Sequence, residues 1–370
     1  MKIAHLDTGR SWRGGQQQVL LLMEGLRARG VDGILLAPAG PLLERARAAG
    51  LATRTWNARG EWDLGAVAAA ARAIRSASPD VVHLHSAHAH TLGVLAARLA
   101  GPGSAGCPPP PAVVSRRVDF AVAGNPLSRL KYRMPVARYF CISRGVAAVM
   151  RAGGVPEDRL ALVPSGVTFA SAEEIAAAPD LRAELALAPG TPLVGTVAAL
   201  APHKNHADLL RAAPDVIAGR EDAHFVWIGE GECRPALEAR RRALGLDDRV
   251  HLTGFREGAR AFIPQFDAFV MPSYLEGLCT SIMDAQSLGV PVVATDTGGI
   301  PDLVSEGATG WLVPPRDPGA LALAILEALG DRAEAERRAR AARTSVEAFH
   351  ADRMVERSIE EYRRLIEPAA

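Results

Sequence analysis

The feature that most constrains this chain is a regular alternation of short apolar runs with longer amphipathic stretches. Short apolar runs bounded by turn residues are typical of strands buried in parallel sheets. The stretches between them carry apolar residues at helical spacing, as in Val19, Leu22, Met23 and Leu26. The alternation therefore predicts repeated βαβ units. In the first half, the predicted strands are residues 3–6, 34–37, 81–85, 112–114 and 139–142.

The alternation of apolar runs and amphipathic stretches is interrupted over residues 164–192, where an alanine-rich, proline-containing segment follows Ser165 and Gly166. We interpret this segment as a domain linker, because few elements are expected in it. After it, the predicted strands are residues 193–197, 225–228, 250–252, 268–271, 290–294 and 311–313. The fold class predicted is therefore α/β, with two Rossmann-like domains facing each other across a cleft. Their expected bounds are 1–168, 169–350 and, for a C-terminal helix that crosses back to the first domain, 351–370.

Composition and charge narrow the classes of protein. The 370 residues exceed an ordinary single domain, and 48% hydrophobic with 22% charged residues fits a soluble protein with a substantial core. A net charge of +1 gives no overall attraction to nucleic acid. The four cysteines form no CxxC pair, which predicts free thiols in a reducing compartment. Asp7 and Arg10 interrupt any signal-peptide core, so the expected location is the cytoplasm or the inner face of its membrane.

The most informative stretch is residues 272–299. A predicted strand ends before it, Glu276 lies in the following loop, and Asp284 lies eight residues later on a predicted helix. The helix is expected to begin near residues 277–280, and its first backbone amides lack partners within the helix, so they favour a phosphate or diphosphate. Two carboxylates beside such a site can accept hydrogen bonds from sugar hydroxyls. The alternative is that Glu276 only caps the helix and Asp284 only faces solvent.

This stretch resembles the E-x7-E motif of the family 4 retaining glycosyltransferases, which have the GT-B fold. The resemblance extends over nearly the whole chain, through segments in the family's order and at compatible spacing. They are Gly14-Gly15, residues 142–146, 163–167, 195–204 and 225–231, and Gly298-Gly299-Ile300-Pro301.

The resemblance implies roles for particular residues. Glu276 would contact the hydroxyls of the transferred sugar, and Lys204 would neutralise the departing diphosphate without a metal ion. Asp284 would bind the ribose. The remaining residues implied to bind the donor are Gly14 and Gly15 near its phosphates, the diphosphate-binding amides of Gly277, Leu278, Cys279, Thr280 and Ser281, and Phe255 and Arg256 near the base.

The chain departs from the family pattern at three places. Asp284 stands where the family usually has glutamate, and Ala199 stands where it commonly has arginine. In the loop where many members place a histidine beside the anomeric carbon, residues 115–120 offer Arg116 and Arg117 instead. We predict that Arg116 or Arg117 supplies the missing positive charge, the alternative being two arginines on a solvated loop.

Histidines cluster at the end of one predicted strand, as His83, His85, His88 and His90. With Asp80 they resemble a zinc site, but no acid or cysteine completes a ligand set, so no metal and no cofactor is predicted. His85, at the carboxyl end of the strand, is the candidate to contact acceptor or donor. The alternative is a hydrogen-bonded histidine packed behind the site.

Residues 127–138 mix four cations with apolar residues at near-helical spacing. That pattern predicts either peripheral contact with an anionic membrane or a helix with a solvated basic face. Nucleic acid is not an expected partner, because arginines alternate with acids elsewhere in the chain.

The expected function is transfer of a sugar from a UDP- or GDP-sugar to a hydroxyl of a glycan or lipid-linked acceptor, with retention. Such a reaction belongs to cell-envelope glycolipid, lipopolysaccharide or polysaccharide synthesis. The alternatives are a nucleotide-sugar epimerase on the same fold and a non-catalytic nucleotide-sugar-binding subunit. The sequence leaves the sugar, the base, the acceptor and the oligomeric state open.

Overall fold

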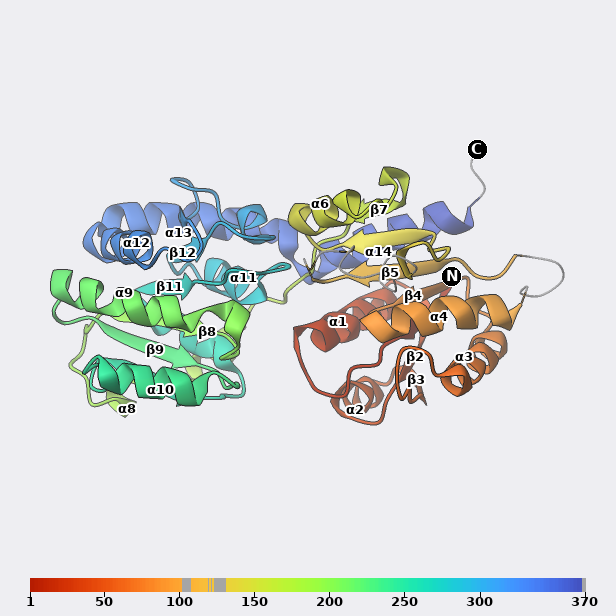
Figure 1. Ribbon diagram of the computed structural model, residues 1–370, viewed down its shortest axis with the longest axis horizontal. Coiled ribbons are helices and arrows are strands. Elements are labelled where there is room, and N and C mark those ends of the chain that lie inside the picture. The colour runs from red at the N-terminus through yellow and green to blue at the C-terminus, as the bar shows by residue number, and fades with distance from the viewer. Residues whose placement is uncertain (102–107, 119, 121, 123–130, 368–370) are drawn as a thin grey trace. The chain divides into compact units, whose positions relative to one another are not determined.

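The computed structural model describes residues 1–101, 108–118, 120, 122 and 131–367, drawn in colour in Figure 1. The chain forms two compact units. Unit 1 comprises Met1–Gly166 together with Ala351–Ala370, and unit 2 comprises Val167–His350. The first crossing from unit 1 to unit 2 therefore lies after Gly166, and the second lies after His350.

Unit 1 is built on a seven-stranded sheet in which every pair of neighbours is parallel, in the order β3-β2-β1-β4-β5-β6-β7. The strands are β1 Lys2–Leu6, β2 Asp32–Ala37, β3 Ala52–Thr55, β4 Val81–Leu84, β5 Ala112–Arg116, β6 Arg138–Cys141 and β7 Leu160–Leu162. The described helices of eight or more residues are α1 Gly14–Ala28, α2 Pro41–Ala48, α3 Leu64–Ala77, α4 Ala87–Ala100, α6 Arg144–Ala152 and α14 Ala351–Ile366.

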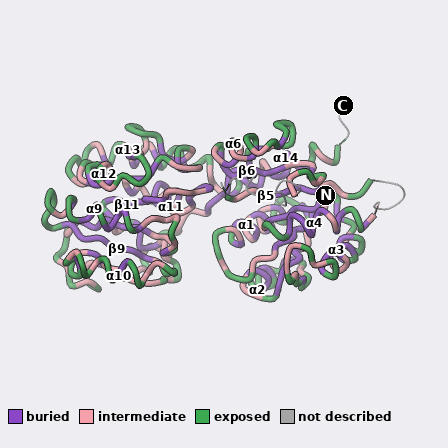
Figure 2. Tube along the Cα trace, viewed as in Figure 1, coloured by how far each residue is buried: buried purple, intermediate pink, exposed green. Residues whose placement is uncertain are grey.

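The last helix, α14, belongs to the core of unit 1. Its apolar residues Met354, Val355 and Ile359 are buried with Ile3 of β1 and with two residues of the apolar stripe of α1, Leu22 and Leu26. Gly25 of α1 allows this close packing, because a Cβ there would lie 2.5 Å from a methyl of Val355. Figure 2 shows the strands of both units largely in the colour of buried residues.

Unit 2 repeats the plan with a six-stranded parallel sheet in the order β10-β9-β8-β11-β12-β13. The strands are β8 Leu193–Val197, β9 His224–Ile228, β10 Val250–Gly254, β11 Ala268–Met271, β12 Val292–Thr295 and β13 Trp311–Val313. Its described α-helices are α7 Ala172–Ala176, α8 Leu181–Glu184, α9 His206–Gly219, α10 Arg234–Ala243, α11 Thr280–Ser287, α12 Pro318–Gly330 and α13 Arg332–Val346. Short 3₁₀ turns complete the described elements: η2 Glu157–Arg159 in unit 1, and η3 Pro202–Lys204, η4 Ala259–Gln265, η5 Ile300–Asp302 and η6 Glu347–Phe349 in unit 2.

The predicted fold class of two Rossmann-like α/β domains is confirmed, and all eleven predicted strands are present with bounds shifted by a few residues at most. Two edge strands, β3 and β7, were not predicted. The predicted linker is too long. Most of residues 164–192 belong to unit 2, where α8 buries Leu181 and Arg182 forms an ion pair with Asp267 at 2.8 Å.

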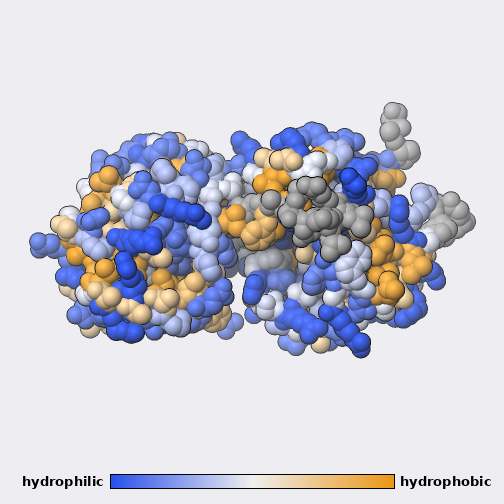
Figure 3. Space-filling view, viewed as in Figure 1, coloured by the Kyte–Doolittle hydropathy of each residue, from blue (hydrophilic) through white to orange (hydrophobic). Residues whose placement is uncertain are grey.

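Of the predicted basic helical face at 127–138, residues 127–130 lie outside the described residues, as does Cys107, while Lys131 and Tyr132 are helical and the chain then enters β6. Lys131 forms an ion pair with Glu61 at 2.6 Å, and Arg138 belongs to β6 and pairs with Glu361 at 3.1 Å. Two of the four cations are therefore paired within unit 1, and membrane contact stays a prediction. The face drawn in Figure 3 mixes hydrophilic residues with smaller hydrophobic groups, and no helix of the described chain is long and apolar enough to cross a bilayer.

Candidate active site

The strand order places two candidate sites, one in each unit. In unit 2 the chain leaves β8 toward one side of the sheet and β11 toward the other, so the order reverses between these neighbouring strands. In unit 1 the same reversal lies between β1 and β4. The carboxyl ends of the strands at such a point leave a crevice in which open α/β sheets bind ligands. The predicted residues Lys204 and Glu276 follow β8 and β11, and Gly14 and His85 follow β1 and β4.

The first pair of predicted residues is in direct contact. The Lys204 ammonium donates a hydrogen bond to a carboxylate oxygen of Glu276, and the two side chains are only 17% and 13% exposed. Burial lowers the pKa of Lys204, but the neighbouring Cys279 and Glu276 raise it, and the net shift is upward. Burial raises the pKa of Cys279 to about 12, so at neutral pH its thiol carries no charge and Glu276 is the effective partner. Lys204 is therefore a fixed cation.

The loop that carries Glu276 is held by neighbouring segments. The amide of Tyr274 donates to the carbonyl of His203 at 3.0 Å, which ties this loop to the turn that ends at Lys204. On its other side, the amide of Gly299 donates to the carbonyl of Glu276 at 2.9 Å, and the hydroxyl of Thr297 donates to the carbonyl of Tyr274 at 3.1 Å. The backbone on both sides of the ion pair is thus fixed before any ligand arrives, which is the condition for a preorganised site.

The helix after this loop begins at Thr280, the last residue of the predicted range. Residue Cys279 is the N-cap of α11, so the four amides without a partner inside the helix are those of Cys279, Thr280, Ser281 and Ile282. Gly277 and Leu278 lie in the loop before it, because the contacts just described hold that loop in a non-helical path. The only group of the N-cap residue near the first-turn amides of Ser281 and Ile282 is the uncharged Cys279 thiol, and the first turn contains no acid. The positive end of this helix therefore remains available to an anion.

Asp284 lies on α11 and has an unusual environment. Burial raises the pKa of Asp284 to about 7, although the nearby Arg260 lowers it. Arg260 cannot turn fully toward Asp284, because its guanidinium is held by both carboxylate oxygens of Glu174 at 2.7 and 2.6 Å and by the carbonyl of Thr168 at 2.7 Å. No ion pair of Asp284 is formed among the described residues, and a carboxyl group kept in so costly an environment is typical of a ligand-binding position.

We expect Asp284→Asn to stabilise the protein at pH 8 and to have little effect at pH 4. Between about pH 4 and 7 an aspartate in the unfolded chain is ionised while the folded carboxyl keeps its proton. The folded state then binds more protons, so its stability falls as pH rises through this window. At pH 8 the variant should gain roughly 2–4 kcal/mol in urea unfolding. The exposed Asp215→Asn is the control, and equal gains at both pH values would contradict the prediction.

The two residues predicted near the base have different surroundings. Phe255 follows β10 and is 76% exposed, so its ring is free to stack on a ligand. Arg256 is engaged within unit 2: its guanidinium pairs with Glu184 at 2.7 Å and lies 4.7 Å from the centre of the Phe262 ring. These contacts tie α8 to η4. Its predicted role toward the donor stays a prediction.

In unit 1, the predicted glycines begin α1. A Cβ at Gly14 would have no atom within 4 Å, and one at Gly15 would meet only Arg117, at 3.9 Å. The space before this helix start is therefore open. Asp7, which the sequence analysis did not assign to the site, fixes the loop that leads to this helix start. Its carboxylate accepts hydrogen bonds from the amide of Gly9 at 2.6 Å and the side chain of Gln16 at 3.2 Å.

The other two predicted residues of unit 1, His85 and Arg116, line one cavity of about 380 Å³ at the carboxyl ends of β4 and β5. Arg117 and Lys131 also line it, together with the start of α4 at Ser86. Both arginines therefore line the cavity, and which of them supplies the missing positive charge stays a prediction.

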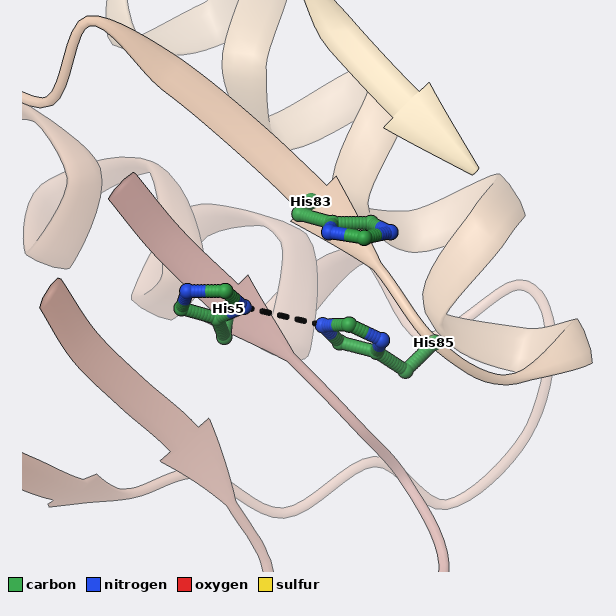
Figure 4. A group of neighbouring side chains, drawn as sticks. All are labelled: His5, His83 and His85. Carbon is green, nitrogen blue, oxygen red and sulfur yellow. Dashed lines mark hydrogen bonds between the residues drawn. The ribbon is translucent and has the colours of Figure 1, made fainter. Parts of the chain in front are cut away.

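His85 belongs to a network of buried imidazoles that includes His5 and His83 (Figure 4). A ring nitrogen of His5 lies 3.0 Å from one of His85. The two nitrogens of His83 lie 2.5 Å from the Tyr362 hydroxyl and 2.8 Å from the Ser115 hydroxyl. Burial lowers the pKa of all three histidines, that of His5 to about 3, so they are neutral at physiological pH.

The sequence analysis assigned the wrong neighbours to His83 and His85. One ligand atom from each of His5, His83 and His85 lies within 4.8 Å of the others, a spacing that suits a metal ion. His90 instead packs against the rings of Tyr132 and Tyr139, and Asp80 accepts a hydrogen bond from the amide of Lys2 at 2.7 Å. Because both nitrogens of His83 already have partners and the Arg117 cation is close by, the arrangement favours a hydrogen-bonded network.

His5 was missed because it lies on a different strand, where it pairs with His83 in the register of β1 and β4. Parallel pairing of the first and fourth strands was the signal that could have found it. Tyr362 was missed for a similar reason, since α14 brings it from the far end of the sequence.

Two protein-family models match the chain. The model described as Glycosyltransferase Family 4 matches residues 12–170, and the model described as Glycosyl transferases group 1 matches residues 191–331. The first falls within unit 1 except at its last residues, and the second falls within unit 2. Between them they include all the predicted site residues.

Similar proteins include a 2-deoxystreptamine N-acetyl-D-glucosaminyltransferase of Streptomyces fradiae, 29% identical over 95% of this chain and 90% of that protein. A UDP-Gal:alpha-D-GlcNAc-diphosphoundecaprenol alpha-1,3-galactosyltransferase of Escherichia coli is 27% identical over 68% of this chain and 67% of its own length. Several other curated relatives are matched over only 32% to 51% of their length. Among solved structures, Anabaena Alr3699/HepE in complex with UDP and glucose has a TM-score of 0.82 at 19% identity, covering 98% of this chain and 99% of that one.

Proposed function

Because the chain belongs to the glycosyltransferases of the family 4 and group 1 type, we propose that it transfers a sugar from a nucleoside diphosphate sugar to a hydroxyl acceptor. The donor is of the UDP or GDP type, the anomeric configuration is retained, and the acceptor is a glycan or lipid-linked sugar of the cell envelope. The observation that carries this proposal is the contact of Lys204 with Glu276 beside the uncapped start of α11.

The chemistry follows from these groups. The bond between the anomeric carbon and the diphosphate oxygen breaks while the acceptor oxygen forms its bond on the same face, and the acceptor proton passes to the departing diphosphate. Lys204 and the first amides of α11 stabilise the charge that develops on the diphosphate, so the proposal needs no metal ion. Glu276 holds the hydroxyls of the transferred sugar, and Asp284 holds the ribose.

The open space at the start of α1 in unit 1 supports the proposed binding of the donor. The two glycines there let a donor phosphate approach the backbone closely. We assign the cavity lined by His85 and Arg116 to the acceptor. If a donor phosphate approaches the start of α1, a side chain added at these glycines should weaken donor binding.

We expect Gly14→Ala to weaken binding of UDP or GDP about 10-fold, because the added methyl occupies space that a phosphate would take. The fold should be unaffected, since Gly14 starts a helix and its Cβ would touch no other group. Gly60→Ala is the matched control, because a Cβ there also meets nothing within 4 Å. Calorimetric titration measures the affinities. An unchanged affinity in Gly14→Ala would remove this glycine from the donor site.

The proposal is tested by incubating the protein with labelled UDP- and GDP-sugars, with and without bacterial lipid extract. We expect a glycosylated product only when acceptor is present, and NMR of its anomeric proton should give the configuration of the donor. Isomerised donor without acceptor would support the epimerase instead. Tight donor binding without any product would support a binding subunit.

A further inference from the structure

The cavity of unit 1 carries positive charge that its own residues do not balance. Among the described residues, no carboxylate lines it. Lys131 is neutralised by Glu61 at 2.6 Å, and the nearby Asp7 acts electrostatically on Arg117. In the part of the chain that the structure describes, no carboxylate lies within ion-pair distance of Arg116. The Arg116 guanidinium donates to the carbonyl of Phe120 at 2.5 Å and lies 5.6 Å from the centre of the Tyr132 ring. Both contacts orient Arg116, and neither partner carries a negative charge.

The start of α4 adds to this charge. Ser86 is the N-cap, but its hydroxyl is engaged by the amide and hydroxyl of Thr8 at 3.0 and 2.7 Å and does not cap the helix. The first turn of α4 contains no acid. Because Ser86 and Ala87 line the cavity, the positive end of a 14-residue helix lies at its wall.

Within the described part of the chain, four enclosed polar atoms of the lining have no hydrogen-bond partner. They are the Nε atoms of Arg116 and Arg117, Nδ1 of His85 and Nε2 of His90. The two histidines are only 5% and 2% exposed, so water does not reach these nitrogens freely. Arginine Nε is always a donor, and each histidine nitrogen can carry a proton. Enclosed groups of this kind are normally satisfied, so their convergence indicates a ligand with several acceptor oxygens.

We propose that this cavity binds an oxyanion of the phosphate type that is carried by the acceptor. The assignment of the anion to the acceptor rests on the proposed function. The binding of an anion rests on the cavity alone. It narrows the acceptors to those that bear a phosphate or a diphosphate near the hydroxyl that is glycosylated. The diphosphate of the donor is a second oxyanion of the same kind. The experiment distinguishes a phosphate of the acceptor from the diphosphate of the donor.

Binding of inorganic phosphate is measured on the full chain at constant ionic strength, by calorimetry, in the wild type and in Arg116→Gln. We expect the variant to bind phosphate at least ~10-fold more weakly, because it loses a charge-assisted contact. Arg116→Lys should lose less, and Arg72→Gln, which removes an exposed cation of α3, should bind like the wild type. Folding of each variant is checked by its Tm. Absence of phosphate binding to the wild type, or equal binding to Arg116→Gln, overturns the proposal.

The titration is repeated with saturating UDP or GDP. We expect phosphate to bind still, and Arg116→Gln to bind the nucleoside diphosphate as the wild type does. Displacement of phosphate by the nucleoside diphosphate would assign the cavity to the donor and overturn the acceptor assignment. If neither UDP nor GDP binds, the proposed function fails, while the anion site is still decided by the comparison of Arg116→Gln with the wild type.

Discussion

Replacing Glu276 by glutamine is expected to lower turnover at least ~100-fold, a typical loss when a preorganised polar contact at a reacting centre is removed. The carboxylate is fixed in place, because its own backbone carbonyl is bound by Gly299 and its side chain by Lys204. Glutamine keeps the shape and one acceptor oxygen. It loses the negative charge that strengthens hydrogen bonds from sugar hydroxyls.

The choice of glutamine separates chemistry from folding. Glu276→Ala would leave the enclosed ammonium of Lys204 without its partner, at a cost of about 1–3 kcal/mol in unfolding free energy. Glu276→Gln should unfold at nearly the wild-type urea concentration. Glu257→Gln, an exposed carboxylate of the same unit, serves as the control and should keep full turnover. Initial rates with the labelled donor decide the matter, and a rate within a few-fold of the wild type would remove Glu276 from the reacting centre.

Most of the fold was predictable from hydrophobic periodicity alone. Strands such as β8 and β11 are fully or almost fully buried, so their sequences are continuous apolar runs. The two strands that were missed lie at the edges of the unit 1 sheet. β3 has the sequence ATRT and is mostly exposed, and β7 has only three residues. Edge strands carry little hydrophobic signal because one side of each has no neighbouring strand, and that is why periodicity did not find them.

The candidate site was predictable in part. Residues that lie in sequence motifs were found, whereas contacts between residues far apart in the sequence were not. Lys204 and Glu276 were assigned through motifs, and the strand order then places their loops at one switch point. The motifs say nothing of particular partners. The pairing of His83 with Tyr362 joins residues 279 positions apart, and the pairing of Arg256 with Glu184 joins residues 72 apart. Such contacts depend on how helices pack, which a single sequence does not encode in any local pattern.

Replacing Lys204 by alanine is expected to weaken binding of UDP or GDP by ~10–100-fold, the loss expected for a charge-assisted contact with phosphate. The reason is that Lys204 is an enclosed cation whose pKa is raised, beside a helix start whose first turn contains no acid. A surface cation of the same unit, Arg242, is the control, and Arg242→Ala should bind as the wild type does.

Replacing Glu276 by alanine should not weaken binding of the nucleoside diphosphate, in contrast to replacing Lys204. A nucleoside diphosphate carries no sugar for Glu276 to hold, and in the free protein the carboxylate competes for the Lys204 ammonium. Glu276→Ala should therefore bind UDP or GDP as tightly as the wild type or more tightly, although its turnover is lost. In the double variant Lys204→Ala, Glu276→Ala the affinity should fall again. If Lys204 only positioned Glu276, removing Lys204 from the Glu276→Ala protein would change nothing, so calorimetry on these four proteins distinguishes a phosphate contact from a structural ion pair.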